Sequence, residues 1–154
     1  MSRWLIKSEP DTFSVDDLAK KPKKTTHWDG VRNFQARNFL RDQMQRGDLA
    51  FFYHSSCEVP AIVGVVKVVK PGYPDHTAFD RKDKHYDADS NPDNPRWYMV
   101  DVQLQRKLQH AITLETLREH ADNELRGLAL LKRGNRLSIT PVSDAHWDFI
   151  LSLE

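Results

Sequence analysis

The sequence predicts a mixed α/β (α+β) fold, a small and mostly antiparallel or mixed β-barrel with surrounding helices. Short β-rich segments outnumber helical ones, and they lack the regular β-α-β alternation of a Rossmann-type sheet. The 154 residues suit one domain, which we place at residues 1–154. With 39% hydrophobic and 29% charged residues, the chain is expected to bury a core without disulfides.

The amino-terminal segment is expected to form a strand followed by a short helix. Arg3 to Lys7 (RWLIK) is short, aromatic and β-branched, as strands typically are. Ser14 followed by Asp17 resembles a capping box that opens a helix at residues 15–20. The basic segment KKPKK, residues 20–24, has a proline in its middle and is predicted as a loop.

The central segment is predicted to hold the longest helix and two strands. From Asn33 to Gln45 the hydrophobic period is helical, with one apolar face formed by Phe34, Phe39, Leu40 and Met44. Gly47-Asp48 ends this helix in a turn, and residues 49–54 (LAFFYH) form a strand. Residues 61–69 (AIVGVVKVV) are apolar on both faces, which favours a central strand in a covered sheet.

The carboxy-terminal half begins with a segment rich in Pro, Asp, Asn and Lys at residues 71–96. This segment is longer than an ordinary connection and predicts a functional loop or a partly helical insertion. The elements expected after it are a strand at 97–104, a capped helix at 113–120, a strand at 137–140 ended by Pro141, and a final helix capped by Ser143.

Composition and motifs argue against several classes of function. The net charge of +1 gives no global field for nucleic acid or membranes, and no apolar stretch approaches the roughly 20 residues of a membrane helix. The lone Cys57 allows no disulfide framework, and the first residues lack a signal peptide, so a cytoplasmic protein is expected. Seven histidines without metal-ligand spacing and the absence of glycine-rich phosphate motifs predict no metal and no cofactor. No nucleophile elbow supports a hydrolase.

A different pattern favours recognition of a nucleobase. Polar and aromatic residues gather at predicted strand ends and at one helix start, where a barrel can form a pocket. They are Lys7, Ser8, Glu9, Trp28, Arg32, Asn33, Tyr53, His54 and Ser55. A tryptophan face can stack on a base while polar side chains contact its edge and the flanking phosphates. From the residues alone, the alternative that Trp28 is a core plug and Arg32 a surface ion-pair partner is favoured, because large aromatic side chains are usually buried for packing.

The chain resembles the EVE domain family. The resemblance is carried by WLIKSEP, WDGVRNFQARNFL, GDLAFFYHS, AIVGVVKVV, WYMVDV and RLSITPV, which occur in the family's order from Trp4 to Val142. It implies a PUA-like fold, kinship with YTH and ASCH domains, and a bacterial origin. Members of this wider group bind DNA or RNA, and several hold a modified base in an aromatic pocket.

The resemblance also implies which residues form the pocket. The corresponding segments are Lys7, Ser8 and Glu9; Trp28; Gly30, Val31, Arg32 and Asn33; and Tyr53, His54 and Ser55. Trp28 is expected to stack on the base, with Asn33 and Ser8 at the base edge. We expect Arg32, Lys7 and His54 to contact phosphate or complete the polar rim.

The resulting hypothesis is a monomeric nucleic-acid reader, a protein that binds a modified base without altering it. Modified cytosine in DNA, such as 5-methylcytosine, is the expected target. An RNA-binding module acting on modified RNA and an enzyme acting on a modified nucleoside are the alternatives. A third is a protein-interaction module in which the lysines of residues 20–24 meet an acidic partner.

Overall fold

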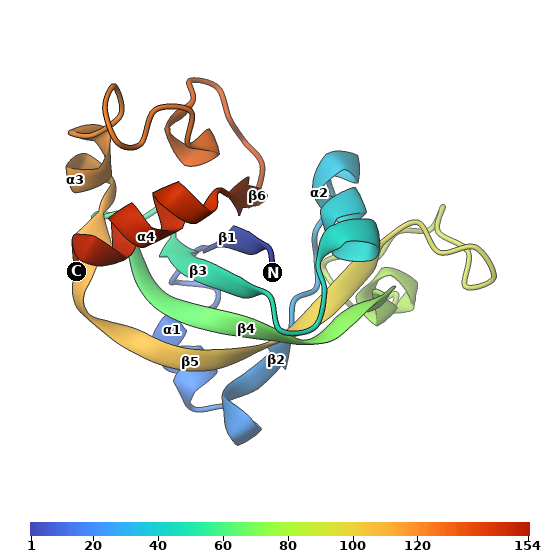
Figure 1. Cartoon of the computed structure of the whole chain (residues 1–154). Helices are drawn as coiled ribbons and strands as arrows, with labels where there is room; N and C mark the ends of the chain where they lie inside the picture. The colour runs from blue at the N-terminus through green and yellow to red at the C-terminus, as the bar shows by residue number, and fades with distance from the viewer.

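The structure is a computed structural model that describes all 154 residues. A strongly curved sheet forms its centre, and short helices lie around it (Figure 1). Six strands form the sheet in the order β2-β5-β4-β3-β1-β6. They are β1 (Arg3–Ser8), β2 (Thr25–His27), β3 (Leu49–His54), β4 (Ala61–Pro74), β5 (Tyr98–Thr113) and β6 (Ile139–Val142).

Helical segments are short and begin at clear caps. The α-helices are α1 (Val15–Ala19), α2 (Phe34–Asn38), α3 (Leu114–Arg118) and α4 (Asp144–Ser152). Shorter turns of other helix types are η1 (Pro22–Lys24), η2 (Phe39–Gln43), η3 (His76–Phe79) and η4 (Ala129–Leu131). Ser14 forms the predicted capping box with Asp17, and Ser143 caps α4 through the His146 N–H. No helix is both long and apolar enough to cross a bilayer.

Strand pairing is mixed, as predicted. β1 runs parallel to β3 and antiparallel to β6, and the remaining pairs are antiparallel. The expected α+β class is therefore confirmed, with β2 and β6 as the edge strands. Pro141 lies inside β6 and does not end the strand, which corrects the predicted boundary at 137–140. An edge strand tolerates proline because one side of it needs no backbone donor.

Both faces of the sheet are covered by hydrophobic side chains. In β1, Trp4 and Ile6 belong to one buried cluster while Leu5 belongs to another. In β4, Val66 and Val65 divide between the same two clusters. This alternation places successive side chains on opposite faces, so the prediction that residues 61–69 form a covered central strand is confirmed.

Two other predicted elements differ from the structure. The helix expected at Asn33–Gln45 is split into α2 and the π-helical turn η2. Phe34, predicted for the apolar core face, is 53% exposed. The strand expected at 97–104 continues to Thr113 as β5 and pairs along β4. β2 was not predicted, because Thr25–His27 gains its strand geometry by pairing with β5 at the sheet edge.

Candidate functional site

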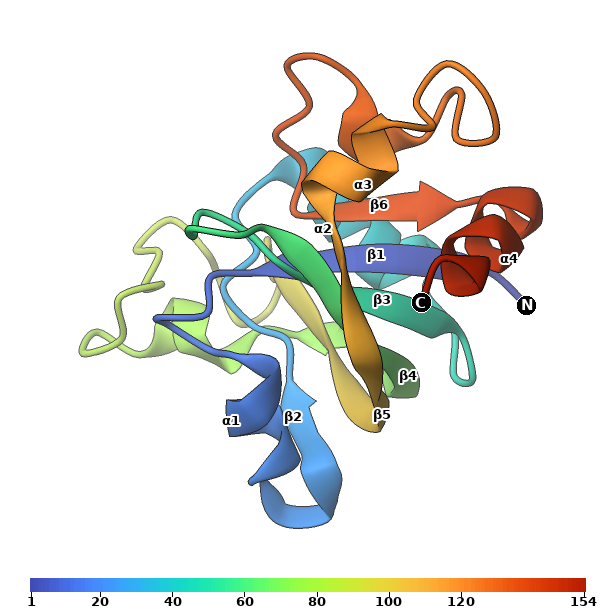
Figure 2. The ribbon, with the colours of Figure 1, turned by 90° about the vertical axis from the view of Figure 1, so that its left-hand side faces the viewer.

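A pocket of about 510 Å³ opens where three distant parts of the chain meet. The end of β1, the segment leading from β2 to α2, and the 75–96 loop lie together on the left of Figure 2, away from both termini. The residues that line the pocket are Lys7, Ser8, Glu9, Thr12, Phe13, Thr26, His27, Trp28, Asp29, Gly30, Val31, Arg32, Lys84, His85 and Ser138. Only Phe13, Trp28 and Val31 are hydrophobic. The volume falls within the roughly 300–1,000 Å³ of ligand sites.

Trp28 belongs both to the core and to the pocket wall. Its backbone N–H donates to the Val100 carbonyl at 2.7 Å, which fixes the residue directly after β2. The indole meets Phe52 edge-on at 5.5 Å between centroids and Phe13 edge-on at 6.4 Å. Its exposed fraction is only 9%, yet it lines the pocket. The two interpretations of Trp28 therefore describe different sides of one side chain.

The end of β1 supplies a partly buried cation. Lys7 pairs with Tyr53 of β3 in the sheet register, and its side chain reaches the pocket. Burial lowers the pKa of the Lys7 ammonium group, which has no carboxylate partner in the chain. An anion bound in the pocket would offset this desolvation. The Ser8 hydroxyl donates to the Phe13 carbonyl and so ties the β1 end to another part of the lining.

Asp75 organises the segment between Trp28 and α2. Its side chain is fully buried and accepts from the Gly30 N–H at 2.9 Å and from Arg32 at 3.0 Å. Burial alone raises the pKa of the Asp75 carboxyl. Hydrogen bonds from Thr77, Gly30 and Arg32 outweigh burial and hold that pKa below its usual value. The ionised Asp75 carboxylate therefore holds Gly30 and Arg32 in place beneath the pocket.

Arg32, expected to contact phosphate or complete the polar rim, lies in the pocket lining and is bonded to Asp75 beneath it. Its guanidinium group donates to the carbonyls of Val31 and His85, to Asp75 and to the Thr77 hydroxyl. Five hydrogen bonds use all five N–H donors of an arginine. Arg32 lines the pocket, but it has no donor left for a ligand unless part of the network opens.

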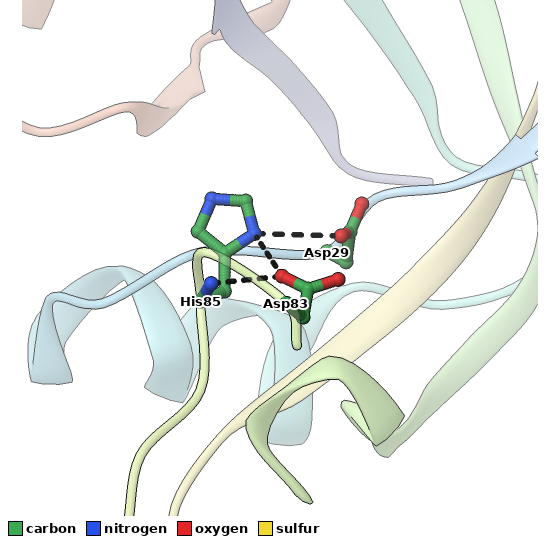
Figure 3. A group of neighbouring side chains, drawn as sticks. All are labelled: Asp29, Asp83 and His85. Atoms are coloured by element: carbon green, nitrogen blue, oxygen red, sulfur yellow. Dashed lines mark hydrogen bonds and ion pairs between the residues drawn. The ribbon is translucent and has the colours of Figure 1, made fainter. Parts of the chain in front are cut away.

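His85, Asp29 and Asp83 form a small charged cluster at the pocket edge (Figure 3). The His85 Nδ1 atom lies 3.4 Å from an Asp83 oxygen and 3.6 Å from an Asp29 oxygen. The Asp83 carboxylate also accepts from the His85 backbone N–H at 2.8 Å, which fixes its orientation. These three groups could supply ligands to a cation, and without one they act as an ion-pair cluster when His85 is protonated.

Four residues expected in the pocket lie outside its lining. Asn33 is exposed and caps α2 by accepting from the Ala36 N–H at 3.0 Å. Tyr53 is buried in the core cluster on the other face of the sheet. His54 accepts from the Val15 N–H through Nε2, and the Ser55 N–H donates to the Ser8 carbonyl. The structure thus gives these side chains or backbone groups a local structural role.

The sequence predicts a functional loop or a partly helical insertion at residues 71–96 but identifies no site residue in it. This segment contributes Lys84 and His85 to the lining and Asp75 beneath it. One local signal existed. Asp75 directly follows a strand and accepts from the Thr77 N–H as a helix cap. Other lining residues not singled out from the sequence are Thr12, Phe13, Thr26, His27, Asp29 and Ser138.

The fold and this pocket define a class of small α+β domains with one largely polar cavity walled by a tryptophan. The EVE domain family matches residues 2–153, and the chain belongs to that family. Thymocyte nuclear protein 1 from Gallus gallus is 50% identical, over 98% of this chain and 68% of that protein. The Homo sapiens protein is 48% identical, over 99% of this chain and 74% of its own length.

Solved structures of related proteins share the fold of this chain. The human THYN1 protein in complex with 5-methylcytosine-containing DNA superposes with a TM-score of 0.95 at 47% identity. That match covers 99% of this chain and 97% of the human chain. A Pseudomonas syringae protein superposes with a TM-score of 0.91 at 43% identity and covers 98% of each chain.

Proposed function

We propose that this protein is a reader that holds a modified cytosine of DNA in the pocket walled by Trp28. The observation that carries the proposal is the combination of a tryptophan wall, an unpaired partly buried lysine and several polar side chains around one cavity of ligand size. The human relative bound to 5-methylcytosine-containing DNA, with its TM-score of 0.95, supports DNA over RNA as the target.

Each kind of contact has a candidate in the pocket lining. The Trp28 indole offers a face for stacking, which contributes about 1–3 kcal/mol per base at such platforms. The carboxylates of Glu9 and Asp29 are acceptors, and cytosine presents an amino donor at N4. Lys7 and Lys84 are cations without carboxylate partners and suit the flanking phosphates. The base would leave its stack to reach the pocket.

Selectivity for a methyl group alone is expected to be modest. Burying one methyl group gains about 1 kcal/mol, which corresponds to roughly fivefold in affinity. Stronger preference requires a hydrogen bond to a hydroxymethyl group or steric rejection of other bases. A preference near fivefold for 5-methylcytosine is therefore the quantity that the proposal predicts.

The proposed reader binds the modified base without altering it. It is also proposed to be a monomer with a single domain over residues 1–154. The Ser8 hydroxyl in the lining donates to a backbone carbonyl and is not paired with a base, as the nucleophile of a hydrolytic site would be. Cys57 is a free thiol, as suits a reducing compartment such as the cytoplasm.

The test is a binding panel of short DNA and RNA oligonucleotides that each carry one modified or unmodified cytosine, measured at two salt concentrations. Tightest binding to a modified DNA cytosine supports the proposal. Equal affinity for all DNA oligonucleotides, or preference for modified RNA, contradicts it. Incubation of the protein with modified nucleosides and analysis for product separates a reader from an enzyme, because a reader returns each nucleoside unchanged.

A further inference from the structure

Phe34 is an exposed aromatic side chain in the segment that directly follows the pocket lining in the chain. It is 53% exposed, and Tyr86, the other exposed large aromatic, is 39% exposed. Phe34 follows the lining residue Arg32 by two positions, and Tyr86 directly follows the lining residue His85. Two residues of extended chain span at most about 7 Å, so the Phe34 backbone lies near the pocket rim. A single exposed aromatic residue is common on a protein surface, so the neighbours of Phe34 decide whether it has a role.

The Phe34 ring is held in place by its neighbours. It stacks on Trp97 with 4.8 Å between ring centroids and 24° between planes. The Trp97 indole N–H donates to Asp87 at 2.6 Å, and the Arg37 guanidinium carbon lies 4.9 Å from the Phe34 centroid. A ring supported in this way loses little conformational entropy when it contacts a partner.

Charge near Phe34 favours a polyanion as that partner. Arg37 donates to the Arg96 carbonyl and the Asn38 side-chain oxygen, both uncharged groups, so its positive charge is not neutralised by a bonded carboxylate. Lys84 and Lys7, on the pocket itself, also lack a carboxylate partner. Aromatic side chains interleaved with such cations are typical of surfaces that bind nucleic acid.

We propose that Phe34 packs against the base next to the one held in the pocket, with Arg37 at the adjoining phosphate. The inference rests on the proposed function and adds a second contact to it. Extrusion of a base leaves a gap in the stack, and proteins that disturb base stacking frequently insert apolar side chains there. Successive nucleotides are spaced by about 3.4 Å along a strand, so a neighbour lies within reach of a side chain two residues from the pocket.

The experiment uses duplex DNA with one 5-methylcytosine and 2-aminopurine at the neighbouring position, together with the unmethylated duplex. Phe34→Ala should weaken binding to both duplexes by about tenfold and leave their ratio unchanged. At saturation, the 2-aminopurine emission should be higher than in the wild-type complex, because the neighbouring base has lost its packing. Phe34→Leu keeps an apolar side chain and should lose much less affinity.

Two further variants control the result. Val59 is 61% exposed and lies outside the pocket lining, so Val59→Ala should bind like the wild type. Phe34→Gln keeps a long side chain without the ring, and it decides the outcome if thermal unfolding shows that Phe34→Ala is not folded.

Wild-type affinity and emission in folded Phe34 variants would overturn this inference while the methylation preference of the wild type still stood. A wild-type protein that binds none of the duplexes would remove the proposed function and this inference together.

Discussion

At the residue scale, Trp28 combines a structural and a recognition role that are difficult to separate by mutation. Its indole packs against Phe52 and Phe13 while it lines the pocket. Truncating a buried tryptophan to alanine costs about 3–5 kcal/mol of stability. Lost binding in Trp28→Ala would therefore not distinguish an unfolded protein from a missing stacking wall, and phenylalanine is the better replacement.

Gly30 is predicted to accept a side chain only with backbone strain and a shift of His85. Its φ of +78° lies in the left-handed region, and a Cβ atom would lie 2.4 Å from His85 Cε1. Gly30→Ala should cost about 1–2 kcal/mol in backbone strain and also displace the His85 ring, which weakens DNA binding. Chemical denaturation and a DNA titration measure the two effects.

Gly127 provides a matched control, because its φ is +85° and nothing lies within 4 Å of an added Cβ atom. Gly127→Ala should therefore lose stability through backbone strain and keep its affinity for DNA. If Gly30→Ala bound DNA as tightly as Gly127→Ala, the close packing of His85 over Gly30 would have no bearing on the pocket.

Lys7 is predicted to account for part of the salt dependence of DNA binding. Each phosphate neutralised on duplex DNA contributes about −0.9 to the slope of log K against log salt. Lys7→Met should weaken binding to all sequences and make this slope shallower by about one. Titrations at four salt concentrations measure it, and Lys107→Met is the control, because Lys107 pairs with Asp16 and does not line the pocket. An unchanged slope for Lys7→Met would remove Lys7 from the phosphate contacts.

At the element scale, the hydrogen bond that attaches the start of α1 to His54 is predicted to depend on pH. The Val15 N–H donates to His54 Nε2, which can accept only while the imidazole is neutral. Burial lowers the pKa of His54, and the nearby Asp16 charge opposes this only in part. Between the lowered folded value and about 6.5, the unfolded chain binds more protons, so stability falls as pH drops below about 6.5.

Unfolding free energies at pH 7.5 and 5.5 test this linkage. The wild type should lose more stability over this interval than His54→Gln, whose amide oxygen can accept without titrating. Subtracting the variant removes the contribution of the other six histidines, which both proteins share. Equal losses in the two proteins would show that His54 does not couple α1 to pH.

Elements with local signals were predictable, and those set by distant contacts were not. The capping box at Ser14 and the apolar run of β4 identified their elements from the sequence. The helix from Asn33 did not continue, and its π-helical turn packs against Gly72, where a Cβ atom would lie 2.4 Å from the Leu40 carbonyl oxygen. That approach joins residues some thirty positions apart, and no periodicity encodes it.

The pocket was predictable to a similar extent. The structure brings the predicted segments containing Lys7, Trp28 and Gly30 together at one edge of the sheet, whereas the predicted residues 53–55 lie outside the lining. The hydrogen bonds that hold the Arg32 guanidinium group could not be predicted, because its partners Asp75 and His85 belong to a loop without a distinctive sequence pattern. A polar residue in a motif can be either a ligand contact or the support beneath one, and the hydrogen bonds that it makes within the protein decide which.

At the scale of the whole molecule, the curved sheet separates two buried clusters, and only one of them borders the pocket. Trp28 belongs to the first cluster, whereas Trp147 stacks on Phe51 in the second, with 3.8 Å between ring centroids. Both indoles are nearly buried, at 9% and 4% exposure. Replacing either with phenylalanine should cost comparable stability, so the pair separates loss of packing from loss of recognition.

The most direct measurement of the central claim is the affinity of the wild type, Trp28→Phe and Trp147→Phe for one duplex containing 5-methylcytosine. The smaller ring of Trp28→Phe should lower affinity by about tenfold, on the scale of stacking at aromatic platforms, while Trp147→Phe binds like the wild type. Equal affinities in all three proteins, each shown to be folded, would contradict the assignment of Trp28 as the wall on which the base stacks.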